Sequence, residues 1–154
     1  MEKEHNRIHL DKERIKRYKE KLEYMEKISH NFEEWTKNVS GNDSSNRITM
    51  KDQFSIYHAF QIMAELVADI IAMVVKDIKV IPKNDYDNID TLRKKKLISQ
   101  ELSNRLKKIN GLRNRLVHHY NDVDEEIAYN DCKSYHSNIK HFVKVIDTWL
   151  KINS

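Results

Sequence analysis

Glycine, proline and cysteine are scarce in this chain of 154 residues, which has two glycines, one proline and one cysteine. So few glycines and prolines provide few sites for the tight turns between the strands of a sheet, so the composition predicts long helices. The single cysteine, Cys132, excludes an intramolecular disulfide and fits a reducing compartment; we interpret it as a small buried apolar residue. The length predicts one domain over residues 1–154, large enough for a real core.

A long hydrophobic run is also missing. Residues 1–21 are densely charged, which excludes a signal peptide of the usual kind. The most apolar stretch, residues 54–75, contains His58, Gln61, Glu65 and Asp69, which membrane hydrocarbon would penalise. We therefore expect no membrane span and no membrane partner, and a soluble cytoplasmic protein.

Neither sign of charge dominates, because 28 Lys and Arg stand against 24 Asp and Glu. A formal net charge of +4 permits contact with nucleic acid without establishing it. The distribution says more, since residues 93–119 hold nine basic side chains and one acid, Glu101. The basic residues are Arg93, Lys94, Lys95, Lys96, Arg105, Lys107, Lys108, Arg113 and Arg115.

Apolar residues that recur every three or four positions predict four long helices. Their inward faces include Trp35 in the first helix and Ile127 in the last. Short connections between them favour an up-down arrangement, so the predicted fold class is all-α: an up-down four-helix bundle with an extra short helix. The expected helices cover residues 8–39, 49–79, 99–120 and 122–150, with the short one at 90–96.

Local signals mark the ends of these helices. Thr49 with Asp52 three residues later is typical of a capping box, and Ser99 is placed to cap the next long helix. Asp122 or a neighbour should cap the last one. Gly111 lies inside a predicted helix, which indicates either close approach of another backbone or neutral drift at an exposed position.

Polar side chains interrupt the apolar second helix in a regular way. Gln61, Glu65 and Asp69 follow four apart and share a narrow face, with His58 just before them. Carboxylates on an apolar helix need partners, because an unpaired buried charge is costly. They either reach solvent or a neighbouring helix, or hold Arg113 or His118 across the bundle. For Asp69 both alternatives stay open, whereas for Glu65 we favour contact with solvent or a neighbouring helix. We interpret His58 as a half-buried structural histidine.

The segment Leu112–Tyr120 gathers two arginines, two histidines, an asparagine and a tyrosine at a helix end. A purely structural helix end does not need that combination, whereas phosphate chemistry does: arginine binds phosphoryl oxygens and histidine moves protons near neutral pH. No HExxH motif and no Cys/His cluster accompanies it. We therefore expect no metal site and no cofactor.

Helix geometry constrains how this segment could work. Five residues turn through roughly 500°, which leaves Arg113 and His118 about 140° apart around one straight helix. A single such helix cannot aim both side chains at one substrate atom. Either the helix unwinds near His118, or a second copy of the chain completes the site.

The spacing of four side chains resembles the signature motif of the HEPN superfamily: Arg113, Asn114, His118 and Tyr120. A motif that ends in tyrosine, as this one does at Tyr120, is similar to that of HepT-type toxins. The resemblance implies a helical homodimer whose paired motifs face one cleft and cut RNA without a metal. His118 would be the general base or acid, and Arg113 would stabilise charge on the phosphorus oxygens. Asn114 would orient His118 or bind the phosphate.

The resemblance also implies partners and regulation. Lys107, Lys108 and Arg115 would contact the RNA backbone. Tyr120 would accept AMP groups from a minimal nucleotidyltransferase (MNT) antitoxin, and the added charge would exclude RNA. Two other functions remain open: a non-catalytic HEPN subunit of a nucleotidyltransferase complex, and a helical adaptor whose basic helix binds an acidic protein.

Overall fold

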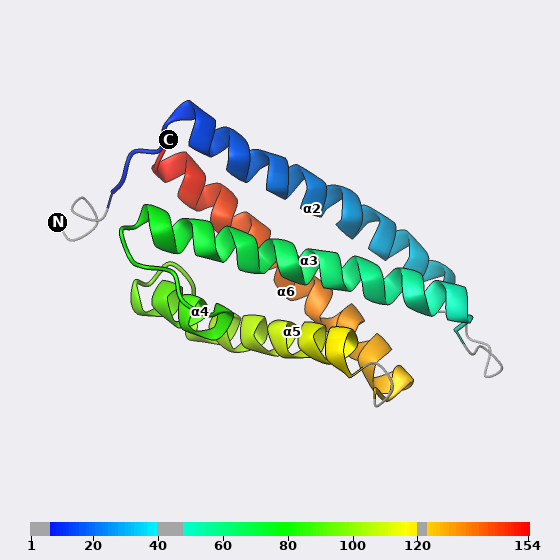
Figure 1. Cartoon of the computed structure of the whole chain (residues 1–154). Helices are drawn as coiled ribbons and strands as arrows, with labels where there is room; N and C mark the ends of the chain where they lie inside the picture. The colour runs from blue at the N-terminus through cyan, green and yellow to red at the C-terminus, as the bar shows by residue number, and fades with distance from the viewer. Residues whose placement is uncertain (1–6, 40–47, 120–122) are drawn as a thin grey trace.

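The computed structural model describes residues 7–39, 48–119 and 123–154, and this part of the chain is helical without strands. Four long helices alternate in direction, and α4 lies in the connection between α3 and α5 (Figure 1). The predicted fold class, an all-α up-down four-helix bundle with an extra short helix, is confirmed. The helices are α2 (Lys12–Val39), α3 (Met50–Asp77), α4 (Asp85–Lys94), α5 (Gln100–His118) and α6 (Glu125–Ile152).

Side-chain caps fix where the long helices begin. The Thr49 hydroxyl accepts the Asp52 N–H at the start of α3, and the Ser99 hydroxyl accepts the Leu102 N–H at the start of α5, both as predicted. At α6 the cap is Asp124, whose carboxylate accepts the N–H of Ile127 at 3.0 Å.

Two helices begin elsewhere than predicted. The short helix starts at Asp85 rather than residue 90, because the Asn84 side chain caps it by accepting the Asp87 N–H at 2.9 Å. The first helix starts at Lys12 rather than residue 8, because the Asp11 carboxylate caps it by accepting the Arg14 N–H at 2.8 Å. The Leu10 N–H donates to the Asn153 carbonyl at 2.9 Å, which ties the two described ends together (Figure 1).

Helix α3 is the centre of the bundle and packs against all four other helices. By length and composition it is the one described helix apolar enough to cross a membrane. Over half of its most apolar stretch, 56%, is buried inside the bundle, as a central core helix requires. Its buried residues are Ile56, Ala59, Phe60, Met63, Ala64, Leu66, Val67, Ile70, Ile71, Val74 and Val75.

The backbone conformations after α3 and α4 are unusual for lysine. Lys79 and Lys96 have φ of 66° and 60°, in the left-handed region that glycine favours. Each lies just past a helix end, and the residue after it donates its N–H to a carbonyl of the last helical turn. Val80 donates to the Val75 carbonyl and Leu97 to the Leu92 carbonyl.

Gly111 lies within α5 without close approach of another backbone. The nearest foreign atom to an added Cβ would be the Tyr86 hydroxyl oxygen, at 3.6 Å, which is ordinary contact. Of the two alternatives left open for Gly111, the close approach of another backbone is therefore excluded.

A buried histidine joins α2 to α6. His136 Nε2 lies 2.6 Å from the Ser29 hydroxyl oxygen, and its ring packs against Phe32. Burial lowers the pKa of His136, because the charged ring would lose its hydration there.

Candidate active site

The arginine of the motif is held in place from two sides. Its Nη2 donates to Glu65 Oε1 on α3 at 3.1 Å, and its Nη1 donates to Asn114 Oδ1 at 3.0 Å. Gln61 Nε2 donates to the same Glu65 oxygen at 3.3 Å. These contacts form a chain from Gln61 through Glu65 to Arg113 and Asn114, which we call the arginine network. It fixes a guanidinium at the boundary between α3 and α5.

Arg113 is not fully hydrogen-bonded within the arginine network. The Nε of Arg113 is buried and has no acceptor among the described residues. Leaving a buried donor unpaired is unfavourable, and each such group in a native structure needs an explanation. The Arg113 Nε is one of two buried side-chain polar atoms without a partner among the described residues, and the other is the Ser103 hydroxyl.

The two carboxylates on α3 have different partners. Glu65, which we expected to face solvent or a structural partner, is the one that holds Arg113. Asp69, weighed equally for that role, pairs instead with Lys21 of α2 at 3.6 Å and is 61% exposed. Of the two alternatives left open for Asp69, the structure shows the ion pair with a neighbouring helix, and Arg113 pairs instead with Glu65, one turn earlier on α3.

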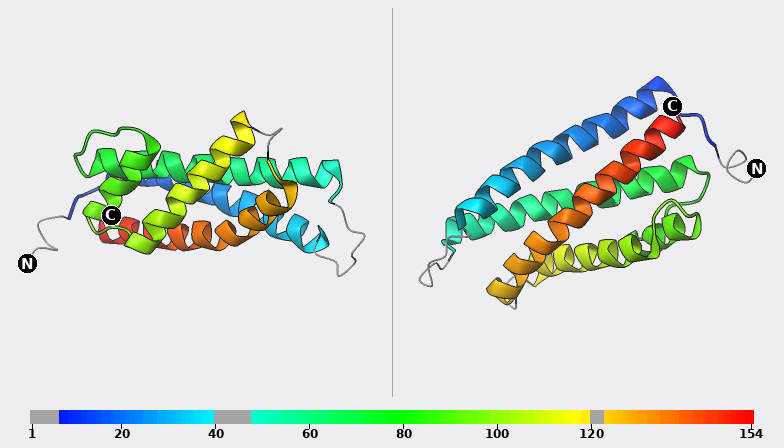
Figure 2. Two further views of the ribbon diagram at one scale, coloured as in Figure 1. Left: turned by 90° about the horizontal axis from the view of Figure 1, so that it is seen from below. Right: turned by 180° about the vertical axis from the view of Figure 1, so that it is seen from behind.

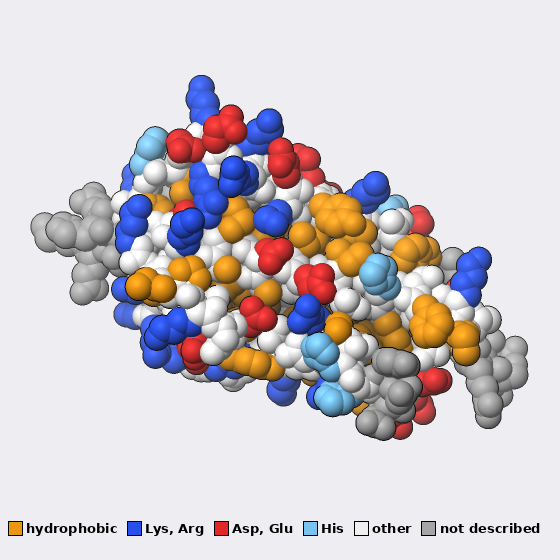
Figure 3. Space-filling model, viewed as in Figure 1, with side chains coloured by type: hydrophobic (Ala, Val, Ile, Leu, Met, Phe, Trp, Pro, Cys, Tyr) orange, Lys and Arg blue, Asp and Glu red, His pale blue; other side chains and the backbone are white. Residues whose placement is uncertain are grey.

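His118 is exposed at the last residue of α5, and His119 is the exposed residue that caps the helix. Seen from below, α5 runs obliquely across the other helices and its yellow end stands out from the body (Figure 2). Figure 3 shows histidine side chains gathered over this end of the molecule. The helix is regular up to His118, so it does not unwind before that residue to bring His118 towards Arg113.

A groove lies beside the arginine network, between the first half of α3, the last turn of α5 and the start of α6. It has a volume of about 710 Å³, and its lining includes Phe54, Tyr57 and His58 of α3 and Leu116 of α5. Gln61 belongs both to this lining and to the arginine network. The groove was not predicted from the sequence, although two large apolar residues at the start of a helix, Met50 and Phe54, were a visible signal.

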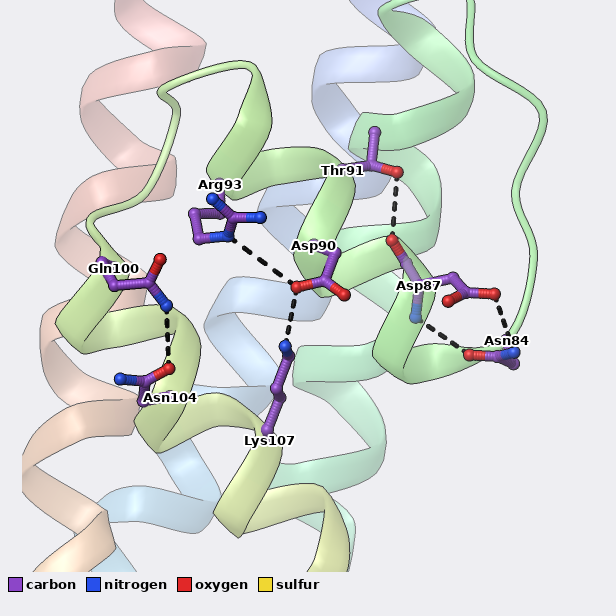
Figure 4. A network of polar contacts seen from close by, with 8 residues as sticks. All are labelled: Asn84, Asp87, Asp90, Thr91, Arg93, Gln100, Asn104 and Lys107. Carbon is purple, nitrogen blue, oxygen red and sulfur yellow. Dashed lines mark hydrogen bonds and ion pairs between the residues drawn. The ribbon is translucent and has the colours of Figure 1, made fainter.

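The predicted RNA-contact residues differ in their availability. Lys108 and Arg115 are exposed. Lys107 Nζ binds Asp90 Oδ1 at 2.7 Å, and Arg93 Nε lies 3.8 Å from the same oxygen (Figure 4). The hydrogen bond from Lys107 lowers the pKa of Asp90. Part of the basic cluster is therefore neutralised within the protein.

Two predictions remain, one on Tyr120 and one on metal binding. Tyr120 lies outside the described residues. Among residues 7–39, 48–119 and 123–154, no group of three or more His, Cys, Asp or Glu side chains is placed to hold a metal ion.

The up-down bundle and the motif at the end of α5 together define a HEPN-type helical domain. The family model for HepT-like ribonucleases matches residues 13–146. The chain therefore belongs to the ribonuclease HepT-like family.

Related proteins agree with this assignment. A protein of Archaeoglobus fulgidus named "Putative RNase" is 31% identical over 138 residues, covering 90% of this chain and 96% of its own. The mRNA nuclease HepT of Shewanella oneidensis is 35% identical over 66 residues, covering 43% of this chain and 50% of its own. The solved structure of the tri-AMPylated Shewanella oneidensis HEPN toxin with its MNT antitoxin has a TM-score of 0.74 at 25% identity, covering 85% of this chain and 96% of that one.

Proposed function

We propose that this protein is a metal-independent ribonuclease toxin of a HEPN/MNT toxin–antitoxin pair, located in the cytoplasm. The observation that carries the proposal is the arginine network, which fixes Arg113 beside an exposed helix end carrying His118. A fixed guanidinium can stabilise the charge that develops on a phosphorane. The nuclease names of the relatives and the toxin–antitoxin complex that shares the fold support it.

The reaction follows from these side chains and from RNA itself. His118 removes the proton of the ribose 2′-hydroxyl, whose oxygen attacks the adjacent phosphorus. Arg113 stabilises the negative charge on the non-bridging oxygens. The P–O5′ bond breaks as the departing 5′-oxygen takes a proton from solvent, which gives a 2′,3′-cyclic phosphate and a 5′-hydroxyl, and His118 then releases its own proton to solvent. Asn114, whose carbonyl oxygen accepts from Arg113, keeps its amide group to donate to the phosphate.

The proposed site is completed by a second copy of the chain. Arg113 and His118 lie on different sides of a helix that stays regular up to His118. A homodimer with the ends of the two α5 helices close together lets the arginine of one copy act with the histidine of the other. A monomer at micromolar concentration in sedimentation would contradict this arrangement.

Matched substrates test the reaction directly. The wild-type protein should cut single-stranded RNA in the presence of EDTA and leave DNA of the same sequence intact, because DNA lacks the 2′-hydroxyl. Equal cutting of DNA, or loss of RNA cutting with EDTA, would reject the mechanism. His118→Ala should abolish cutting and the growth arrest caused by expression, whereas a non-catalytic subunit would cause no arrest in either form.

Regulation would act at Tyr120. In the proposal the antitoxin transfers AMP from ATP to the tyrosine oxygen and releases pyrophosphate. The added phosphodiester lies two residues from His118 and repels an RNA phosphate. Incubation with the nucleotidyltransferase and ATP should add AMP mass to the wild type and none to Tyr120→Phe. Equal mass gain in both would exclude Tyr120 as the acceptor.

A further inference from the structure

The groove beside the arginine network has a lining unlike that of a phosphate site. Met50, Phe54, Tyr57 and Gln61 recur three or four residues apart, so they occupy one face of α3. No Lys or Arg occurs among the described residues that line the groove, whereas the acidic residue Glu125 does. A polyanionic backbone would find no counter-charge in this groove, whereas an uncharged aromatic ring needs none.

Two large apolar side chains stay exposed in this groove. Phe54 is 61% and Met50 is 70% exposed. Figure 3 shows hydrophobic side chains over the end of the molecule where α3 begins. The Tyr57 hydroxyl is already engaged, because it donates to the Glu125 carbonyl at 2.9 Å, so the ring of Tyr57 is fixed as a wall. An exposed aromatic ring beside a rigid wall is a stacking surface.

The groove is continuous with the proposed cleavage residues. Gln61 lines it and also binds Glu65, which holds Arg113. Leu116 lines it from α5, three residues after Arg113 and two before His118. Its volume of about 710 Å³ falls in the range of small-ligand sites. The amide of Gln53 and the ring of His58 add hydrogen-bonding groups to the lining.

From these observations we propose that the groove binds one unpaired nucleobase of the RNA, next to the phosphate held by Arg113. The base stacks on Phe54, and side-chain amides of the groove contact its edge. This inference rests on the proposed ribonuclease function and adds to it a base subsite for single-stranded RNA. Unpaired bases are accessible for such stacking, whereas paired ones are not.

Position-specific fluorescence tests the base subsite without requiring cleavage. The full-length protein would carry His118→Ala, and single-stranded RNAs would carry 2-aminopurine at one position at a time. We expect the 2-aminopurine fluorescence to be quenched at a single position, next to the linkage that the wild-type protein cuts. Phe54→Ala should remove that quenching and weaken RNA binding at least about fivefold, whereas Phe54→Tyr should retain both.

Ile81→Ala is the matched control, because Ile81 is an exposed apolar residue outside the groove, beyond the other end of α3. It should leave both binding and quenching unchanged. Quenching that survives Phe54→Ala, or that no position shows, would overturn the subsite. Dissociation of the homodimer by Phe54→Ala with unchanged quenching would assign the groove to a second copy and overturn it equally. RNA cutting by the wild type is measured separately, so failure of the subsite and failure of the proposed function are distinguishable.

Discussion

Removing the carboxylate that holds Arg113 is the sharpest perturbation of the arginine network. In Glu65→Ala the guanidinium loses its acceptor at 3.1 Å on α3 and keeps only Asn114, its neighbour in sequence. Arg113 and Glu65 are 27% and 42% exposed, between a surface ion pair and a buried one. We therefore expect a loss of about 1 kcal/mol in the free energy of unfolding, or about 2–4 °C in Tm.

The effect on catalysis should exceed the effect on stability. A guanidinium that is free to move samples positions away from the developing charge, and misplacement by about 1 Å can cost ~100-fold in rate. We expect Glu65→Ala to slow single-turnover RNA cleavage by about 10- to 100-fold. Asp69→Ala is the matched control, since Asp69 lies one turn further along α3 and pairs with Lys21. It should cleave at the wild-type rate.

A double-mutant cycle shows whether Glu65 acts through Arg113. Arg113→Ala should slow cleavage further than Glu65→Ala, and adding Glu65→Ala to it should change nothing more. Wild-type cleavage by Glu65→Ala would refute the positioning role. Multiplication of the two effects in the double variant would refute it as well, because Glu65 would then act independently.

Three stability measurements test other parts of the structure. Burial lowers the pKa of His136, so the unfolded chain binds a proton that the folded chain excludes, and stability is lost as pH falls through about 6.5. Urea titrations at several pH values should show the free energy of unfolding falling by up to about 1.4 kcal/mol per pH unit below that point, and His136→Gln should remove this dependence. The same pH dependence in His136→Gln would contradict the role of His136. Gly111→Ala should raise the free energy of unfolding by up to about 1 kcal/mol, because the nearest foreign atom is 3.6 Å from the added Cβ, and a fall in Tm would show a clash. Lys79→Gly and Lys96→Gly should each raise Tm by relieving positive φ, whereas Lys95→Gly, at φ −81°, should lower it; no gain at either site would refute the strain.

Periodicity and caps were sufficient to predict the bundle. The three- and four-residue spacing located all four long helices, and Thr49 and Ser99 cap the helices that their positions predicted. Contacts between distant parts of the chain were not predictable in this way. Trp35 and Ile127 follow the apolar pattern yet are exposed, because each lies near the end of a helix, where fewer neighbours cover it.

The motif was visible in the sequence, but its supporting contacts were not. Glu65 and Asp69 lie four apart on one face of α3, and only the crossing point of α5 decides which one meets Arg113. That crossing point is set by packing between whole helices, which local spacing does not encode. The groove escaped detection for the same reason, since Phe54 and Leu116 lie on different helices.

Mixing two inactive variants tests most directly whether the cleavage site is shared between copies. Arg113→Ala and His118→Ala proteins should each be inactive alone. If the arginine of one copy acts with the histidine of the other, their mixed dimer contains one intact site, and mixing should restore a fraction of wild-type RNA cleavage. A mixture that forms mixed dimers yet stays inactive would contradict the shared site.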